Sequence, residues 1–383
     1  MGGKALEQGS KMTYFRGMEG MRAWLSWAVV FAHIVHMTGA DHTYSFLKVF
    51  MYLGDFAVNV FIMISGFVIT SLILEKKEDY KTYISRRFLR IYPVYLICLI
   101  IGIFASELYA DAMISSPWGE QTPLLDRLIQ SMNSLEGNGY LYHIIAHVTM
   151  LHGAIPNDIL YDSQYMFLAP AWSLSLEWQF YLVAPLIIAL IQKPKGAIIA
   201  ALGAFILLAA YQLGGFGFFR LHSILAGAGI FFGVGIGTRF MMNQLPRLKT
   251  YPVAFMILAL GCAAYGYKTI PFIIFIFLII YILVDQPQDM IGKRIEKGMS
   301  ILLDSKIAHY LGKISYSTYL VHAPVLQLLI YALATYSNLS LIQTVGVLCL
   351  TLPVITFICS ALLNRYVEQP FINFGRKLFS QKS

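Results

Sequence analysis

Long apolar segments recur along the whole chain and constrain its fold more than any other feature of the sequence. Each is about 17–25 residues long, which is the length that an α-helix needs to cross a bilayer. Only 13% of the 383 residues are charged, about half the fraction that is usual in soluble domains. The sequence therefore predicts a polytopic, all-α membrane protein. The ten expected spans lie at about 20–38, 51–74, 89–108, 172–192, 196–213, 221–239, 251–267, 269–285, 314–336 and 341–363.

The distribution of basic residues predicts how these spans are oriented. With the N-terminus in the cytoplasm, all but four of the 28 Lys and Arg residues fall on the inner side. Cytoplasmic loops of membrane proteins are enriched in Lys and Arg, so both termini are expected in the cytoplasm. The net charge of +8 then faces anionic lipid headgroups and gives no indication of a nucleic-acid partner. The four exceptions are Lys48, Arg127, Arg220 and Lys268.

The longest connection, at about 109–171, is expected to be extracytoplasmic. It is acidic and polar, apart from the apolar segment GYLYHIIAHVTMLHG (Gly139–Gly153). This segment is too short to span a bilayer, which predicts an interfacial or re-entrant helix. No appended soluble domain is visible, and we expect one membrane domain over residues 1–383.

Three ionisable side chains interrupt the first apolar segment, GMEGMRAWLSWAVVFAHIVHM. An ionisable residue inside a span indicates a functional site, because its desolvation is costly. Arg22 and His33 lie eleven positions apart, so they share one helix face and are about 16 Å apart along the helix axis. Arg22 is also consistent with an anchor whose charge reaches the membrane interface. His36, within one turn of His33, is expected to be a neighbour of the site.

Glu177, in the segment PAWSLSLEWQFYLVAP, is expected at the same membrane depth as His33. Both residues lie about five positions from the outer boundary of their spans. A carboxylate beside an imidazole fixes its tautomer and raises its basicity, as a general base requires. We therefore predict a Glu177–His33 pair; the alternatives are a purely structural ion pair or two separate sets of polar contacts.

Arg87 and Arg90 lie one turn apart at the cytoplasmic end of the third span. Two guanidinium groups on one helix face suit phosphate groups, although membrane topology alone also produces basic helix ends. His322 precedes Pro324 in a later span. It is either a site residue or a satisfied histidine at a helix kink.

The second span carries further polar and small residues. Asp55 and Asn59 share one face near its outer end, and Ser65 with Gly66 forms a small pair near its middle. Small residues allow helices to approach closely, and the same pair would let a slender ligand pass.

Together these segments resemble the acyltransferase-3 family of integral membrane acyltransferases. The resemblance follows the family's order over nearly the whole chain. It implies transfer of an acyl group, commonly acetyl, from cytoplasmic acyl-CoA to a sugar hydroxyl on the far side, in a bacterial inner membrane. The matching segments are GMEGMRAWLSWAVVFAH, GDFAVNVFIMISGF, RRFLRIYP, AWSLSLEWQFYLVAPL, LGKISYSTYLVHAPV and RYVEQPF.

The resemblance also assigns expected roles to individual residues. It implies that His33 is the catalytic histidine and that Arg22, Arg87 and Arg90 bind CoA. Beside these, the residues themselves lead us to expect Glu177 as a catalytic residue that supports His33 and Ser65 at the CoA site. The residues expected to contact the acceptor are Asp55, Asn59, His322 and Trp172. The chain departs from the family's pattern at positions that bear on acceptor choice more than on donor chemistry, namely Met18, Glu19, Ala57 and Asn59.

The chemistry of the residues fits such a reaction. Arginines at the inner face would hold the phosphates of acetyl-CoA, and a deeper histidine would take the acceptor's proton or, transiently, the acyl group. No metal-ligand spacing occurs, and no metal is expected. The expected partners are acyl-CoA, a glycan or lipid-linked saccharide, and membrane lipid. Two alternatives stay open: a proton-coupled transporter, to which intramembrane His, Glu and Asp also point, and an acyltransferase acting on a cytoplasmic small molecule.

Overall fold

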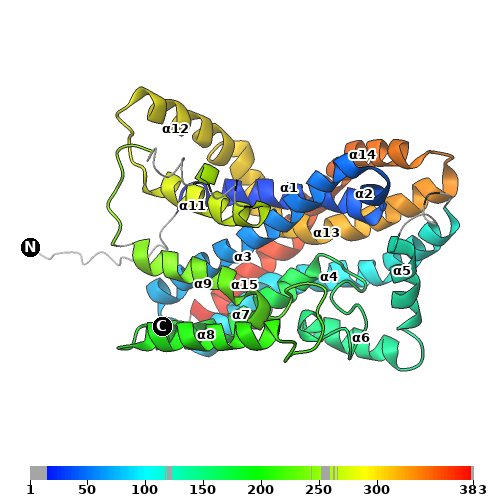
Figure 1. Cartoon of the computed structure of the whole chain (residues 1–383), viewed down its shortest axis with the longest axis horizontal. Coiled ribbons are helices and arrows are strands. Elements are labelled where there is room, and N and C mark those ends of the chain that lie inside the picture. The colour runs from blue at the N-terminus through cyan, green and yellow to red at the C-terminus, as the bar shows by residue number, and fades with distance from the viewer. Residues whose placement is uncertain are drawn as a thin grey trace, which may run out of the picture.

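Long helices laid side by side form almost the whole molecule (Figure 1). The structure is a computed structural model that describes residues 15–116, 118, 123–242, 244–251, 259–261, 264 and 266–380. Its longer elements are α1 (Met18–Met37), α3 (Lys48–Lys76), α4 (Tyr80–Ser115), α5 (Pro123–Asn133), α6 (Gly139–Val148), α7 (Ala171–Ile191), α8 (Gly196–Gln212), α9 (Leu225–Met242), α11 (Ile270–Leu283), α12 (Met290–Leu303), α13 (Lys306–Tyr336), α14 (Leu341–Leu363) and α15 (Gln369–Ser380). The short ones are α2 (Ala40–Thr43), η1 (Ser45–Leu47), η2 (His152–Ala154), η3 (Tyr267–Thr269) and the π-helical turn η4 (Asn364–Glu368).

Six helical segments of the described chain are long and apolar enough to cross a membrane, fewer than the ten predicted spans. Three other predicted spans are also helical: α8 and α11 are apolar but shorter, and α1 carries too many polar groups. The predicted span at 251–267 lies largely outside the described residues. The total of ten spans and the cytoplasmic termini therefore stay predictions. The six segments are Ser45–Lys76, Tyr80–Ser115, Ala171–Ile191, Leu225–Met242, Lys306–Tyr336 and Leu341–Phe379.

Helix α4 extends the predicted span 89–108 at both ends. It begins at Tyr80, where the side chain of Asp79 accepts a hydrogen bond from the backbone N–H of Thr82 at 3.0 Å. Such a cap satisfies an otherwise unpaired N–H of the first turn. As a result, Arg87 and Arg90 lie inside a continuous helix rather than at its start.

Helix α1 packs against α3 and α13, and glycines make these approaches possible. A Cβ atom at Gly312 of α13 would lie 2.0 Å from the carbonyl oxygen of Glu19 in α1. At Gly66 of α3 it would lie 2.5 Å from the carbonyl oxygen of Phe232 in α9. Only glycine permits either contact without displacing backbone, so the predicted role of Gly66 in close helix packing is confirmed.

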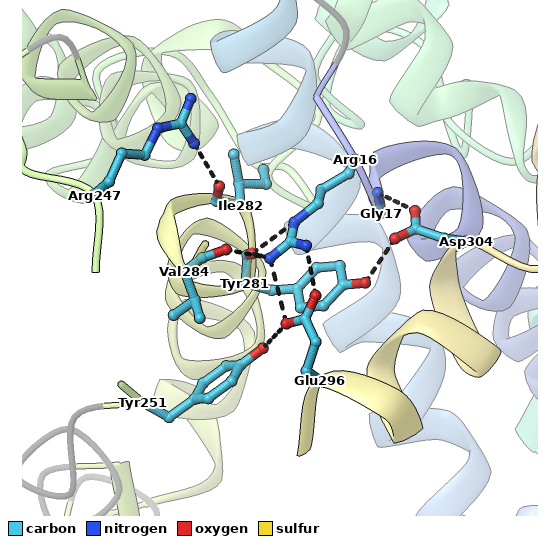
Figure 2. A network of polar contacts seen from close by, with 9 residues as sticks. All are labelled: Arg16, Gly17, Arg247, Tyr251, Tyr281, Ile282, Val284, Glu296 and Asp304. Carbon is cyan, nitrogen blue, oxygen red and sulfur yellow. Dashed lines mark hydrogen bonds and ion pairs between the residues drawn. The ribbon is translucent and has the colours of Figure 1, made fainter. Parts of the chain in front are cut away.

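A polar network fixes the segment that leads into α1 (Figure 2). The Arg16 guanidinium donates to the carbonyl oxygens of Tyr281 (3.0 Å from Nε) and Val284, and it forms an ion pair with Glu296 of α12. The Tyr281 hydroxyl donates to Asp304 at 2.6 Å, and the same carboxylate accepts from the backbone N–H just before α1 at 2.7 Å. The start of α1 is therefore held against α11 and α12.

The predicted long connection is largely structured at the end of the molecule opposite α12 (Figure 1). Its apolar segment forms the ten-residue helix α6, which is too short to span a bilayer. Arg127 of α5 donates to both carboxylate oxygens of Asp162, at 2.8 and 3.0 Å, and Arg220 lies 3.3 Å from the same carboxylate. These ion pairs hold α5 against the loop that precedes α7.

Candidate functional site

A wide basic cavity opens among the ends of α1, α3, α4, α13 and α15. Its volume is about 530 Å³, which lies within the usual range for small-ligand and cofactor sites. We call it the basic cavity; its basic lining residues are Arg22, Lys76, Arg86, Arg87, Arg90, His309, Lys313 and Arg376.

A second cavity, the central cavity, continues from the first into the helix bundle. Arg22, Arg87 and Arg90 line both cavities, so they mark the junction. In the described part of the chain, none of the three forms an ion pair with a carboxylate. The carboxylates that line the two cavities are Glu19, Glu177 and Glu368. Guanidinium groups that no carboxylate binds directly stay available for hydrogen bonds to a ligand, and this arrangement favours an anionic ligand at the junction.

Glu177 lies on the wall of the central cavity, but its partners differ from the predicted one. Its Oε1 atom accepts hydrogen bonds from Ser65 Oγ at 2.8 Å and from the hydroxyl of Tyr181. The predicted Glu177–His33 pair is therefore wrong, and separate polar contacts, the alternative given above, are found instead. Ser65 lines the same cavity as Arg22, Arg87 and Arg90.

His33 pairs with His322 instead. His33 Nδ1 lies 3.2 Å from His322 Nε2 and 2.9 Å from the carbonyl oxygen of Val29, while His322 Nδ1 lies 3.1 Å from the carbonyl oxygen of Thr318. A carbonyl oxygen can only accept, so both Nδ1 atoms carry hydrogen. His322 Nε2 is then the acceptor for His33 Nδ1–H, which leaves His33 Nε2 unprotonated and able to act as a base.

Tyr319 separates the central cavity from this histidine pair. It lines the cavity, and its ring centroid lies 6.2 Å from that of His322. Its hydroxyl is 2.6 Å from Ser173 Oγ and donates to the carbonyl oxygen of Pro170 at 3.0 Å. The pair thus lies one side chain beyond the end of the central cavity.

On the other side of the pair is a third cavity, which we call the α5 cavity because one face of α5 covers it. Its empty volume is about 700 Å³, and it shares no described lining residue with the central cavity. Both histidines of α1 reach it. Its polar and aromatic lining residues are His33, His36, Ser106, Tyr109, Arg127, Ser131, Asp162, Tyr165, Phe167 and Gln327.

The remaining predicted residues lie away from these cavities. Asp55 is exposed, and Asn59 and Trp172 are partly buried, but none of them lines the three cavities. The sequence reasoning missed Tyr319, although its place in the segment SYSTYLVH one turn before His322 could have indicated it. It also missed Gln327, the single amide on the following turns of α13. The described residues contain no group of three His, Cys, Asp or Glu side chains arranged to hold a metal ion.

Comparisons with known proteins indicate the family of the chain. The acyltransferase-3 family model, described as an acyltransferase domain, matches residues 15–362. Acyltransferase MdmB of Streptomyces mycarofaciens is 32% identical over 143 residues, which cover 37% of this chain and 30% of that protein. A Staphylococcus aureus (strain COL) protein with the name "Putative O-acetyltransferase SACOL0978" is 26% identical over 197 residues, 48% of this chain and 26% of that protein.

The two alignments span less than a third of each relative's length, and no solved structure matches the chain. The family model, by contrast, covers all but the first and last short segments of the chain. Together with the six long apolar helices, it indicates an integral membrane protein. The chain belongs to the acyltransferase-3 family.

Proposed function

We propose that the chain is a membrane O-acyltransferase that moves an acyl group, in the simplest case acetyl, from acyl-CoA to a hydroxyl of a cell-surface or lipid-linked glycan. One observation carries the proposal: arginines without a direct ion pair line the central cavity, and the His33–His322 pair lies just beyond Tyr319, which lines the same cavity. An anion site and a base about 16 Å apart along α1 suit a donor with phosphates at one end and a thioester on a long arm.

The phosphates of the donor bind in the basic cavity. Arg22, Arg87 and Arg90 stand at its inner end, while Lys76 and Arg376 extend the basic surface outward. Hydrogen bonds from guanidinium to phosphate are charge-assisted and stronger than neutral ones. The positive-inside distribution of Lys and Arg supports a cytoplasmic location for this cavity, where acyl-CoA is available.

The pantetheine arm lies in the central cavity. Most of the lining is apolar, and Ser65, Glu177 and Tyr181 provide a polar strip along one wall. The thioester then lies beside Tyr319 and Ser173. A rotation of the Tyr319 ring opens the way to His33.

The reaction takes place at His33, where the acceptor hydroxyl meets the thioester of the donor. His33 Nε2 removes the proton of the acceptor hydroxyl, and the oxygen attacks the thioester carbonyl carbon. The C–O bond of the ester forms, the C–S bond breaks, and the CoA thiolate leaves with the proton that His33 has taken. His322 accepts the Nδ1–H of His33 throughout, which stabilises the imidazolium through a fixed ring orientation.

Transfer of label from [14C]acetyl-CoA to the host's envelope saccharides, measured in membranes that contain the chain, tests this function. His33→Ala is expected to lower transfer at least about 100-fold while CoA binding to the purified protein persists. The matched control is His42→Ala, because His42 is exposed on α2 and lies outside the three cavities. Wild-type transfer by His33→Ala, or a wild-type protein that neither binds CoA nor transfers label, would overturn the proposal.

A further inference from the structure

We infer that the α5 cavity is the acceptor site and that Gln327 and His36 bind hydroxyl groups of a neutral saccharide next to the hydroxyl that reacts. The inference rests on the proposed function, since it names the acceptor that His33 would deprotonate. It replaces Asp55, Asn59 and Trp172, which lie outside the cavity, as the acceptor-binding residues.

The first observation is an amide without a partner. Gln327 of α13 is only 5% exposed and lines the α5 cavity. Its Oε1 atom is buried without a hydrogen bond, and no described residue bonds its amide nitrogen. An amide buried in this way costs free energy unless a ligand or water satisfies it. A ligand hydroxyl can do so, since it both donates and accepts.

The second observation is a second unpaired polar group in the same cavity. His36 follows His33 by three positions on α1, so both rings project from the same side of the helix into the α5 cavity. Within the described residues, the His36 side chain makes no hydrogen bond or ion pair. His33, the proposed base, thus has hydrogen-bonding groups from two helices beside it, as recognition of several neighbouring hydroxyls requires.

The charges of the cavity indicate that its ligand is neutral. Arg127 is paired with both oxygens of Asp162, and its guanidinium lies 3.9 Å from the centre of the Tyr165 ring. Asp162 also accepts from Ser131 at 3.0 Å and lies 3.3 Å from Arg220. Both charged groups of the lining are therefore neutralised within the protein, which contrasts with the unpaired arginines of the basic cavity.

The aromatic residues of the lining point to a sugar ring in particular. Tyr109, Tyr165 and Phe167 contribute apolar surface next to the unpaired polar groups. A sugar has apolar C–H faces and a rim of hydroxyls, and this combination of aromatic and amide groups complements both.

The test measures transfer from [14C]acetyl-CoA while the amount of host envelope saccharide is varied. Gln327→Met keeps the approximate shape of the side chain and removes the amide that could hydrogen-bond a ligand. His36→Leu likewise removes the imidazole nitrogens of His36. Each variant is expected to raise the saccharide concentration for half-maximal transfer about fivefold, with the KM for acetyl-CoA unchanged. The controls are Gln212→Leu and His42→Leu, both at exposed positions outside the cavity.

Three outcomes would count against the inference. If both variants leave the half-saturating saccharide concentration unchanged while wild-type transfer is normal, the site is elsewhere and the proposed function still stands. If they raise the KM for acetyl-CoA in parallel, the α5 cavity binds the donor. If the wild-type protein shows no transfer and no CoA binding, the proposed function fails and this inference fails with it.

Discussion

Arginine side chains have opposite roles in the cavities on the two sides of the His33–His322 pair. In the basic and central cavities, Arg87 and Arg90 line open space without a described carboxylate partner. In the α5 cavity, Arg127 is bound by both oxygens of Asp162. A guanidinium held in this way stabilises the wall of a cavity, whereas one without a counter-ion is available to a ligand.

Because of this difference, we expect the two sides to bind different classes of ligand. An unpaired arginine cluster favours a polyanion such as CoA, and a neutral lining with an unpaired amide favours a polyol. The histidine pair lies between them: His33 lines the α5 cavity, and Tyr319 separates the pair from the central cavity. Four changes, given from the largest expected effect to the smallest, test whether the two sides are independent.

His322→Phe removes an acceptor for His33 Nδ1–H. It is expected to leave the binding of both acetyl-CoA and the saccharide unchanged. The Val29 carbonyl oxygen still accepts from His33 Nδ1, so the tautomer persists, but the imidazolium that forms on proton transfer loses its stabilising partner, and kcat should fall about 100-fold. The KM for acetyl-CoA should stay the same, and His322→Gln, which keeps an acceptor oxygen, should restore part of kcat. Initial rates and the pH–rate profile measure this. An unchanged kcat would show that the pair is structural.

Arg87→Ala/Arg90→Ala tests the basic side. The double variant is expected to raise the KM for acetyl-CoA about 10- to 100-fold, because hydrogen bonds to charged groups are lost, while the half-saturating saccharide concentration stays the same. Arg294→Ala is the control, since Arg294 is exposed on α12. If the donor KM does not change, the two arginines serve only membrane topology.

Asp162→Asn tests the α5 side. It weakens the ion pairs to Arg127 and Arg220, so α5 should be cleaved more readily in limited proteolysis and saccharide half-saturation should rise about threefold. The KM for acetyl-CoA should stay the same. Asp126→Asn, at an exposed position of α5, is the matched control. A change in donor KM would mean that the two sides are coupled.

Acidification should destabilise the region around α6. Burial lowers the pKa of His143 and of His147 in α6 from 6.5 to about 4, even though the nearby Asp162 carboxylate favours the charged form of His143. Between pH 6.5 and 4 the unfolded segment binds protons that the folded one does not, so its free energy of unfolding falls as pH falls through this range. Limited proteolysis of α5 and α6 at pH 7 and pH 4.5 measures the loss. Equal cleavage at both values would contradict the pKa shifts.

Much of the helix arrangement could be predicted from the lengths of apolar runs, and α3, α7 and α14 lie close to the predicted spans. The start of α4 could not, because its first turns are polar. Membrane depth placed His33 and Glu177 at one level, but depth does not fix the rotation of a helix about its axis. In the fold, Glu177 is turned toward Ser65 of α3 and His33 toward α13.

The site could be predicted only where it depends on spacing within one helix. The Arg22–His33 separation on α1 placed one residue at the arginine junction and the other at the α5 cavity. Gln327 is a single polar residue in an apolar segment, and nothing local indicates its role. Only the packing of α13 on α1 brings it to the same cavity as His36.

The most direct test of the account is the sidedness of the reaction in sealed vesicles of known orientation. [14C]acetyl-CoA is supplied only inside or only outside, and the acceptor saccharide only on the opposite side. We predict label transfer when acetyl-CoA faces the basic cavity and the saccharide faces the α5 cavity, and none in the reverse arrangement. Transfer that requires both substrates on the same side would contradict the account.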